Sequence, residues 1–118
     1  DFYAAIASEA SRRMSLFNPQ ETSNTVWAYA RAGVSAPSLF KAVSSHAPTK
    51  MAEFNAQELS NTAWAFAKAG VEAPLLFEAI ADEAVAKMDT FHEQALIDTQ
   101  WAFETAKVGA STLFQALA

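Results

Sequence analysis

Apolar residues recur along this chain at helical spacing, and no stretch alternates apolar and polar side chains with a period of two. Near the amino terminus, for example, Phe2, Ile6 and Ala10 follow one another four residues apart. Side chains at this spacing share one face of an α-helix, whereas a half-buried strand requires alternation. The pattern therefore predicts an all-α chain. The expected helices cover residues 1–16, 19–32, 37–52, 56–69 and 74–88, followed by one in the third copy that is capped at Thr90 and one over 111–118.

Sequence signals for helix ends support these boundaries. Asn18 is a good N-cap, Pro19 suits the first helical position, and Glu21 stands where a capping-box acid reaches back. Gly33 can adopt the left-handed conformation that ends a helix. The same signals return at Asn55, Glu58 and Gly70. In the third copy, Thr90 and Glu93 are expected to form the capping box, and Lys107 replaces the glycine.

The chain repeats itself every 37 residues, as Trp27, Trp64 and Trp101 show. A fixed period between about 20 and 50 residues is typical of stacked helical repeats. We therefore expect one domain over 1–118, an α-solenoid of about three 37-residue helix-turn-helix repeats. The expected units are residues 18–54, 55–91 and a truncated 92–118, preceded by a half-repeat helix over 1–17.

Large side chains that keep this period are expected to form the structural core. They are Trp27, Trp64, Trp101, Phe17, Phe54 and Phe91, together with the pairs Leu39-Phe40, Leu76-Phe77 and Leu113-Phe114. A buried indole removes roughly 150–250 Å² of surface from water, so a ladder of tryptophans between repeats would stabilise the stack. The alternative is an aromatic platform that contacts a ligand.

Polar residues keep the same period and share one face of the first helix in each repeat. The set is Gln20, Asn24 and Arg31, then Gln57, Asn61 and Lys68, then Gln94, Asp98 and Thr105. Amides can read base edges and basic side chains can hold phosphates, so this stripe is the candidate ligand surface. Alternatively, the asparagines satisfy backbone groups and the basic residues complement helix C-termini. Helix-end complementarity is also the favoured explanation for a second basic series, Arg13, Lys50 and Lys87.

Composition narrows the possible functions. The 118 residues carry a net charge of −5 and no cysteine. The acidity argues against a strong general affinity for nucleic acid, and disulfides and thiolate sites are excluded. His46 and His92 have no companion at metal-ligand spacing, and the chain shows no phosphate-binding loop or nucleophile motif. We therefore expect no enzyme activity, no catalytic residue, no metal, no cofactor and no membrane-spanning segment.

The segment from Asn55 to Val71, Asn-Ala-Gln-Glu-Leu-Ser-Asn-Thr-Ala-Trp-Ala-Phe-Ala-Lys-Ala-Gly-Val, resembles the octotricopeptide repeat. The signature of that family has a P-Q-x-L-A-N-x-x-W-A-x-A-x-x-G core, and weaker copies extend the resemblance over essentially the whole chain. It implies a right-handed α-solenoid that binds RNA in chloroplasts or mitochondria. The residues that would face RNA are Gln20, Asn24, Arg31, Gln57, Asn61, Lys68, Gln94 and Asp98.

Two functions remain open at this point. The first is a module that binds single-stranded RNA in organellar gene expression. The second is a structural or protein-binding solenoid subunit of a large organellar complex. The negative net charge and the divergent sequence of the third repeat favour this second function. In the second case, further repeats or a partner chain are expected to cover the ends of the stack.

Overall fold

The computed structural model describes residues 1–107, and within them it contains six α-helices, three 3₁₀ segments and no strand. The helices are α1 (Phe2–Arg12), α2 (Pro19–Ala32), α3 (Pro37–His46), α4 (Ala56–Ala69), α5 (Pro74–Ala86) and α6 (Glu93–Ala106). The 3₁₀ segments are η1 (Met14–Leu16), η2 (Ala47–Glu53) and η3 (Met88–Thr90). The all-α prediction is confirmed. The helix expected over 111–118 lies outside the described residues.

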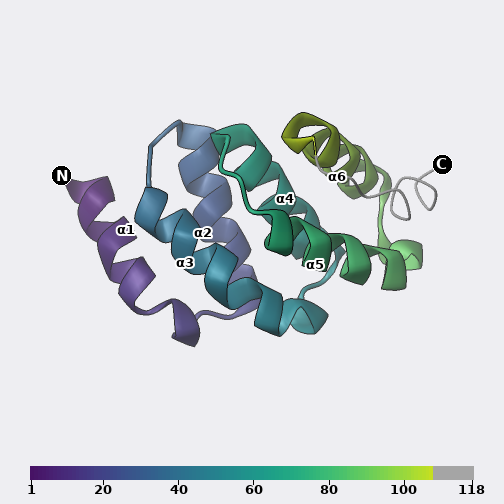
Figure 1. Cartoon of the computed structure of the whole chain (residues 1–118), viewed down its shortest axis with the longest axis horizontal. Coiled ribbons are helices and arrows are strands. Elements are labelled where there is room, and N and C mark those ends of the chain that lie inside the picture. Colours follow the sequence, from purple (N-terminus) through teal and green to yellow (C-terminus); the bar gives the residue numbers. More distant parts are fainter. Residues whose placement is uncertain (108–118) are drawn as a thin grey trace.

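The helices form two rows (Figure 1). In one row α4 lies between α2 and α6 and packs extensively against both. In the other row α3 contacts α1 on one side and α5 on the other. Small residues line the contacts within the first row, including Ser60, Ala63 and Ala65, each fully buried. Their size lets neighbouring helices approach closely, and Ser60 Oγ donates a hydrogen bond to the Ala95 carbonyl 3.3 Å away.

The predicted helix starts and stops of α2 and α4 are confirmed. Asn18 and Glu21 form a complete capping box, as do Asn55 and Glu58. Both helices end at a left-handed glycine, Gly33 and Gly70, each with φ of 70°. These ends fix the lengths of the two helices, which have 14 residues each.

Other predicted boundaries are wrong. The helices expected over 1–16, 37–52 and 74–88 each stop early and continue as a 3₁₀ segment. In α3 the cause is Pro48, which cannot donate a backbone hydrogen bond and clashes with the preceding turn. The Thr90 capping box does not form, because His92 is the N-cap of α6 and the Thr90 hydroxyl donates to the Lys87 carbonyl instead.

Edge-to-face aromatic pairs join the two rows. Phe40 of α3 meets Phe66 of α4 with ring centroids 4.9 Å apart, and Phe77 of α5 meets Phe103 of α6 at 5.0 Å. All four rings are at most 2 % exposed. Such pairs add about 0.5–1.5 kcal/mol beyond the burial of their area. These phenylalanines, with Leu39 and Leu76, form the centre of the core, as predicted for two of the Leu-Phe pairs, whereas Leu113-Phe114 lies outside the described residues.

The tryptophans reach the core only in part, because Trp64 packs against it but none of the three is fully buried. Trp101 is 41 % exposed, and Trp27 and Trp64 are only half-buried. Each tryptophan lies two positions before an aromatic residue that does enter the core, and positions two apart point to opposite sides of a helix. The indoles therefore remain at the outer rim of the first row. Of the phenylalanines expected beside them, Phe54 and Phe91 are buried and Phe17 is half-buried.

Two lysines of the second basic series tie the turns together. Lys87 Nζ donates to the carbonyls of Ala52 and Phe54, at 2.7 and 2.6 Å, and pairs with Glu83 at 3.1 Å. Lys50 Nζ makes the equivalent bonds to the carbonyls of Ser15 and Phe17, at 2.9 and 3.4 Å. Bonds between turns, rather than complementarity to their own helix ends, thus explain these two lysines.

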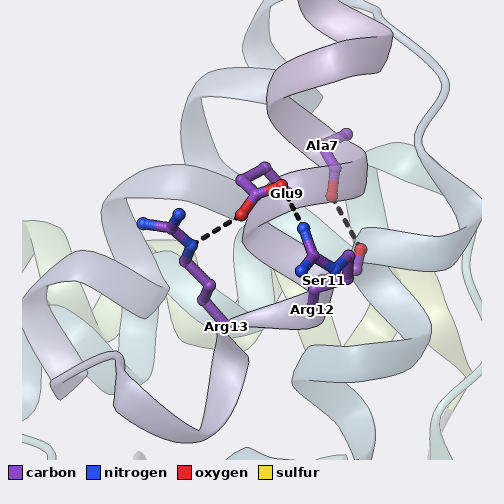
Figure 2. A network of polar contacts seen from close by, with 5 residues as sticks. All are labelled: Ala7, Glu9, Ser11, Arg12 and Arg13. Carbon is purple, nitrogen blue, oxygen red and sulfur yellow. Dashed lines mark hydrogen bonds and ion pairs between the residues drawn. The ribbon is translucent and has the colours of Figure 1, made fainter.

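Arg13 occupies the same place in the period as Lys50 and Lys87 but bonds within its own helix region (Figure 2). Its Nε donates to Glu9 Oε2 at 2.6 Å, and Arg12 reaches the other oxygen of the same carboxylate. The hydrogen bond from Arg13 is the largest cause of a lowered pKa at Glu9. The Glu9–Arg13 pair repeats the spacing of Glu83 and Lys87, which places the acid four residues before the base.

Candidate nucleic-acid interface

The central helix α4 offers one exposed stripe. Between Leu59 and Ala67 only Asn61 and Trp64 escape full burial, because α2, α6 and the second row cover the remaining sides. Gln57 and Lys68 extend the stripe to both ends of the helix, and both are exposed. With 3.6 residues per turn, these four side chains fall within about 60° of one another around the helix axis. Any ligand that approaches α4 from this side meets an amide pair, an indole and an ammonium group.

The three tryptophans form a ladder across α2, α4 and α6. Ring centroids of Trp27 and Trp64 are 6.3 Å apart, and those of Trp64 and Trp101 are 6.2 Å apart, with interplanar angles of 38° and 34°. The Arg31 guanidinium lies 5.4 Å from the Trp27 ring centroid, in cation–π contact. Indole rings side by side on a surface provide the π-faces on which unpaired bases can stack.

Amide side chains lie beside the tryptophan ladder on both α4 and α2. Gln57 Nε2 donates to Asn61 Oδ1 at 2.8 Å. Gln20 and Asn24 are the corresponding residues of α2, and both are exposed. Asn61 therefore bonds a neighbouring side chain rather than a backbone group. This finding favours the ligand-surface interpretation of the stripe over the interpretation in which the asparagines satisfy the backbone.

The stripe changes its chemistry on α6. Gln94 Nε2 donates to Asp98 Oδ1 at 2.9 Å, so a carboxylate stands where the other helices carry an asparagine. Thr105 takes the place of the basic residue and is exposed. The combined face thus carries two cations, Arg31 and Lys68, over α2 and α4, and one anion over α6.

A pocket of about 340 Å³ lies where α2 turns into α3. It is lined by Tyr29, Gly33, Phe40 and Lys68, among others. Lys68 therefore stands both on the stripe and at the edge of this hollow. Within residues 1–107 no group of three histidine, aspartate or glutamate side chains is placed to hold a metal ion. In the same range no helix has the length and apolarity needed to cross a membrane.

The sequence profile of one protein family, described as RNA-editing substrate-binding complex 6 protein, matches residues 1–118. The chain belongs to this family. A search of curated proteins gives no match. Membership assigns the chain to the RNA-editing substrate-binding complex, which takes part in mitochondrial RNA editing in kinetoplastids.

Membership in the RNA-editing substrate-binding complex 6 family corrects the resemblance drawn from the sequence. The chain is not a member of the octotricopeptide-repeat family, because the profile that covers its whole length is a different one. The Trp-Ala-x-Ala segments that carried the resemblance place small residues in the contacts between first-row helices, and this local pattern does not by itself show membership. Of the two organelles that the resemblance implied, family membership supports the mitochondrion.

For this RNA-editing substrate-binding complex 6 family chain, the structure brings the predicted polar residues together on neighbouring helices. That the tryptophans lie on the same helix face as these polar residues was not predicted from the sequence. Trp64 is seven residues after Gln57 and four before Lys68, which places it within the polar stripe. A helical projection would have shown this, but the usual preference of indoles for the interior argued against it.

Proposed function

We propose that this chain is a non-enzymatic helical-repeat module that binds single-stranded RNA across α2, α4 and α6. The observation that carries the proposal is the ladder of three indoles flanked by amide and basic side chains. Membership in a family named for an RNA-editing substrate-binding complex supports an RNA ligand. The module would contribute to substrate binding by that complex in the mitochondrion.

The repeat architecture is part of this proposal. Units over 18–54 and 55–91 would each supply one first-row helix and one second-row helix, with 1–17 and 92–118 as partial units. The equivalent aromatic pairs and the equivalent lysine bonds between turns, each separated by one 37-residue period, support these boundaries. In such a stack every unit would present the same face, so an RNA strand could cross several helices in succession.

The expected affinity is modest. Replacing an aromatic side chain on which a base stacks with alanine typically weakens binding by about 1–3 kcal/mol for each base. Two cations, Arg31 and Lys68, can neutralise two phosphates, which gives a slope of about −1.4 for log K against log salt on a single strand. The overall charge of −5 opposes binding at longer range. Binding therefore depends on stacking more than on charge, with Kd in the range of roughly 10⁻⁴–10⁻⁶ M.

Fluorescence anisotropy with a labelled single-stranded RNA tests this function. The double variant Arg31→Ala/Lys68→Ala should bind more weakly and lose most of the salt dependence, while the charge-matched control Arg12→Ala/Lys41→Ala should bind like the parent. Arg12 and Lys41 are exposed on the second row, away from the ladder. No binding by the parent at protein concentrations up to about 10⁻⁴ M, the weak end of that range, would refute the proposal.

A protein-binding role is the second candidate, and one observation favours it. Phe2, Tyr3, Ile6 and Leu16 are between 42 and 80 % exposed on the α1 side. Three of these positions correspond, one period later, to Leu39, Phe40 and Val43, which the structure buries. An apolar edge of this kind suits a neighbouring helix. A variant in which polar residues replace these four side chains would separate the two roles. If that variant is monomeric by light scattering and still binds RNA, the apolar edge serves a protein partner and the RNA site lies elsewhere.

A further inference from the structure

Two exposed side-chain pairs, glutamine–asparagine on α4 and glutamine–aspartate on α6, have the same geometry but leave different atoms available for a ligand. On α4, Gln57 donates to Asn61 Oδ1. On α6, Gln94 donates to Asp98 Oδ1. Both bonds run between residues four apart on the exposed stripe, and both occupy the first side-chain oxygen. The two helices therefore differ at the second terminal atom, which is an amide nitrogen in Asn61 and a carboxylate oxygen in Asp98.

This difference determines what each helix can bond. The Asn61 Nδ2 group offers two hydrogen-bond donors, and the Gln57 oxygen beside it offers an acceptor. Ionised Asp98 offers acceptors alone, and each of its oxygens has two lone-pair sites. Bonding by Gln94 to one oxygen leaves three lone-pair sites of the carboxylate free, at least one on each oxygen. The Asp98 carboxylate is thus an acceptor-only group beside Trp101.

An acceptor-only carboxylate discriminates among the four bases. A guanine presents two adjacent donors, N1–H and N2–H₂, on its Watson–Crick edge, so it can bond both oxygens of one carboxylate. Adenine and cytosine present a single amino group there, and uracil presents N3–H between two carbonyl acceptors. A carboxylate also repels phosphate, and Thr105 on the same helix supplies no positive charge to offset that repulsion. Over α6 the protein is therefore expected to contact the edge of an RNA base rather than the RNA phosphate backbone.

We propose that Asp98 is a specificity-determining residue that selects guanine over α6, through a bidentate hydrogen bond to N1–H and N2–H₂. The proposal rests on the RNA-binding function above. In it, Trp101 stacks the guanine, while Arg31 and Lys68 hold the strand over α2 and α4. Asn61 on α4 and Asp98 on α6 occupy equivalent positions, so the two otherwise similar helices would prefer different bases.

The test compares RNA nonamers that differ at one position. The background is adenosine, and the central base is guanine, adenine or inosine, which keeps N1–H but lacks the N2 amino group. A bidentate contact discriminates roughly five- to a hundredfold, and an exposed one belongs at the low end. The parent protein should bind the guanine nonamer at least about fivefold more tightly than the adenine nonamer, with inosine between them.

Asp98→Asn is the matched variant, because it reproduces the Gln57–Asn61 arrangement and keeps the oxygen that Gln94 bonds. It should bind all three nonamers within about twofold of one another, because it lacks the second carboxylate oxygen that a bidentate contact to guanine needs. Equal binding of the three nonamers by the parent, or a guanine preference that survives in Asp98→Asn, would overturn the inference and leave RNA binding intact. Absence of binding to every nonamer would overturn both.

Discussion

Replacing Lys87 with methionine should destabilise the fold by breaking a link between two turns. Lys87 comes directly after α5, and its ammonium group donates to the carbonyls of Ala52 and Phe54, in the turn before α4. The Glu83 carboxylate, 3.1 Å away, orients it. Methionine keeps the length of the apolar stem, so the change removes the charge and its hydrogen bonds while it preserves most of the packing.

The magnitude follows from the number of bonds and their exposure. A hydrogen bond that involves a charged group contributes about 1.5–3 kcal/mol when it is well formed. Lys87 forms two, but its side chain is 27 % exposed, so water can replace part of what is lost. We expect a loss of about 2–3 kcal/mol. Lys50→Met should cost about 1 kcal/mol, because its second bond is 3.4 Å long and His46 stands where Lys87 has its glutamate.

Urea unfolding followed by circular dichroism measures this difference, with stability taken from linear extrapolation. Lys41→Met is the control, since Lys41 is exposed on α3 and a surface substitution of this kind changes stability by less than about 0.5 kcal/mol. The m-value should stay constant across the three variants. If Lys87→Met and Lys41→Met unfold at the same urea concentration, the bonds between turns do not stabilise the stack and this reasoning is wrong.

Three further changes have defined outcomes. Gly70→Ala should cost about 1 kcal/mol in urea unfolding, because the left-handed φ of 70° strains an alanine although the space around it is open. Tyr29→Phe removes the hydrogen bond that the hydroxyl donates to the Tyr3 carbonyl, at 2.7 Å, so it should cost about 1 kcal/mol and speed amide exchange in α1. The lowered pKa of Glu9, caused chiefly by its bond from Arg13, means that this carboxylate stabilises the fold above its unfolded pKa. That contribution should begin to shrink as pH falls below the ordinary glutamate pKa of about 4.3, so the stabilities of the parent and Glu9→Gln should approach each other at lower pH, as measured by thermal unfolding at several pH values.

Much of the fold could be predicted from the sequence because its signals are local. Asn18, Glu21 and Gly33 determine where α2 begins and ends through contacts within a few residues, and the structure shows each of these contacts. The early ends of α1, α3 and α5 could not be predicted as easily. In α3 the interruption depends on Pro48, whereas no proline interrupts the corresponding ends of α1 and α5.

The candidate site was predicted in part. Periodicity placed Gln57, Asn61 and Lys68 on one face, and the structure shows that face to be the one that α4 leaves uncovered. The partial exposure of Trp64 was not predicted, because hydrophobicity alone does not say which of two opposite faces enters the core. Phe66, two residues later, packs against Phe40 of the second row, and the indole is left at the rim. That choice depends on the neighbouring helices rather than on the residue itself.

The most direct test of RNA binding on this face uses the three tryptophans as probes. They are the only tryptophans in the chain, and all three belong to the ladder. A ¹H–¹⁵N spectrum therefore contains three indole signals, one from each of α2, α4 and α6. Titration with single-stranded RNA should shift all three indole signals while the amide signals of α1, α3 and α5 stay in place. Saturable RNA binding that leaves the indole signals unmoved, or that shifts the second-row amides instead, would contradict the proposed interface.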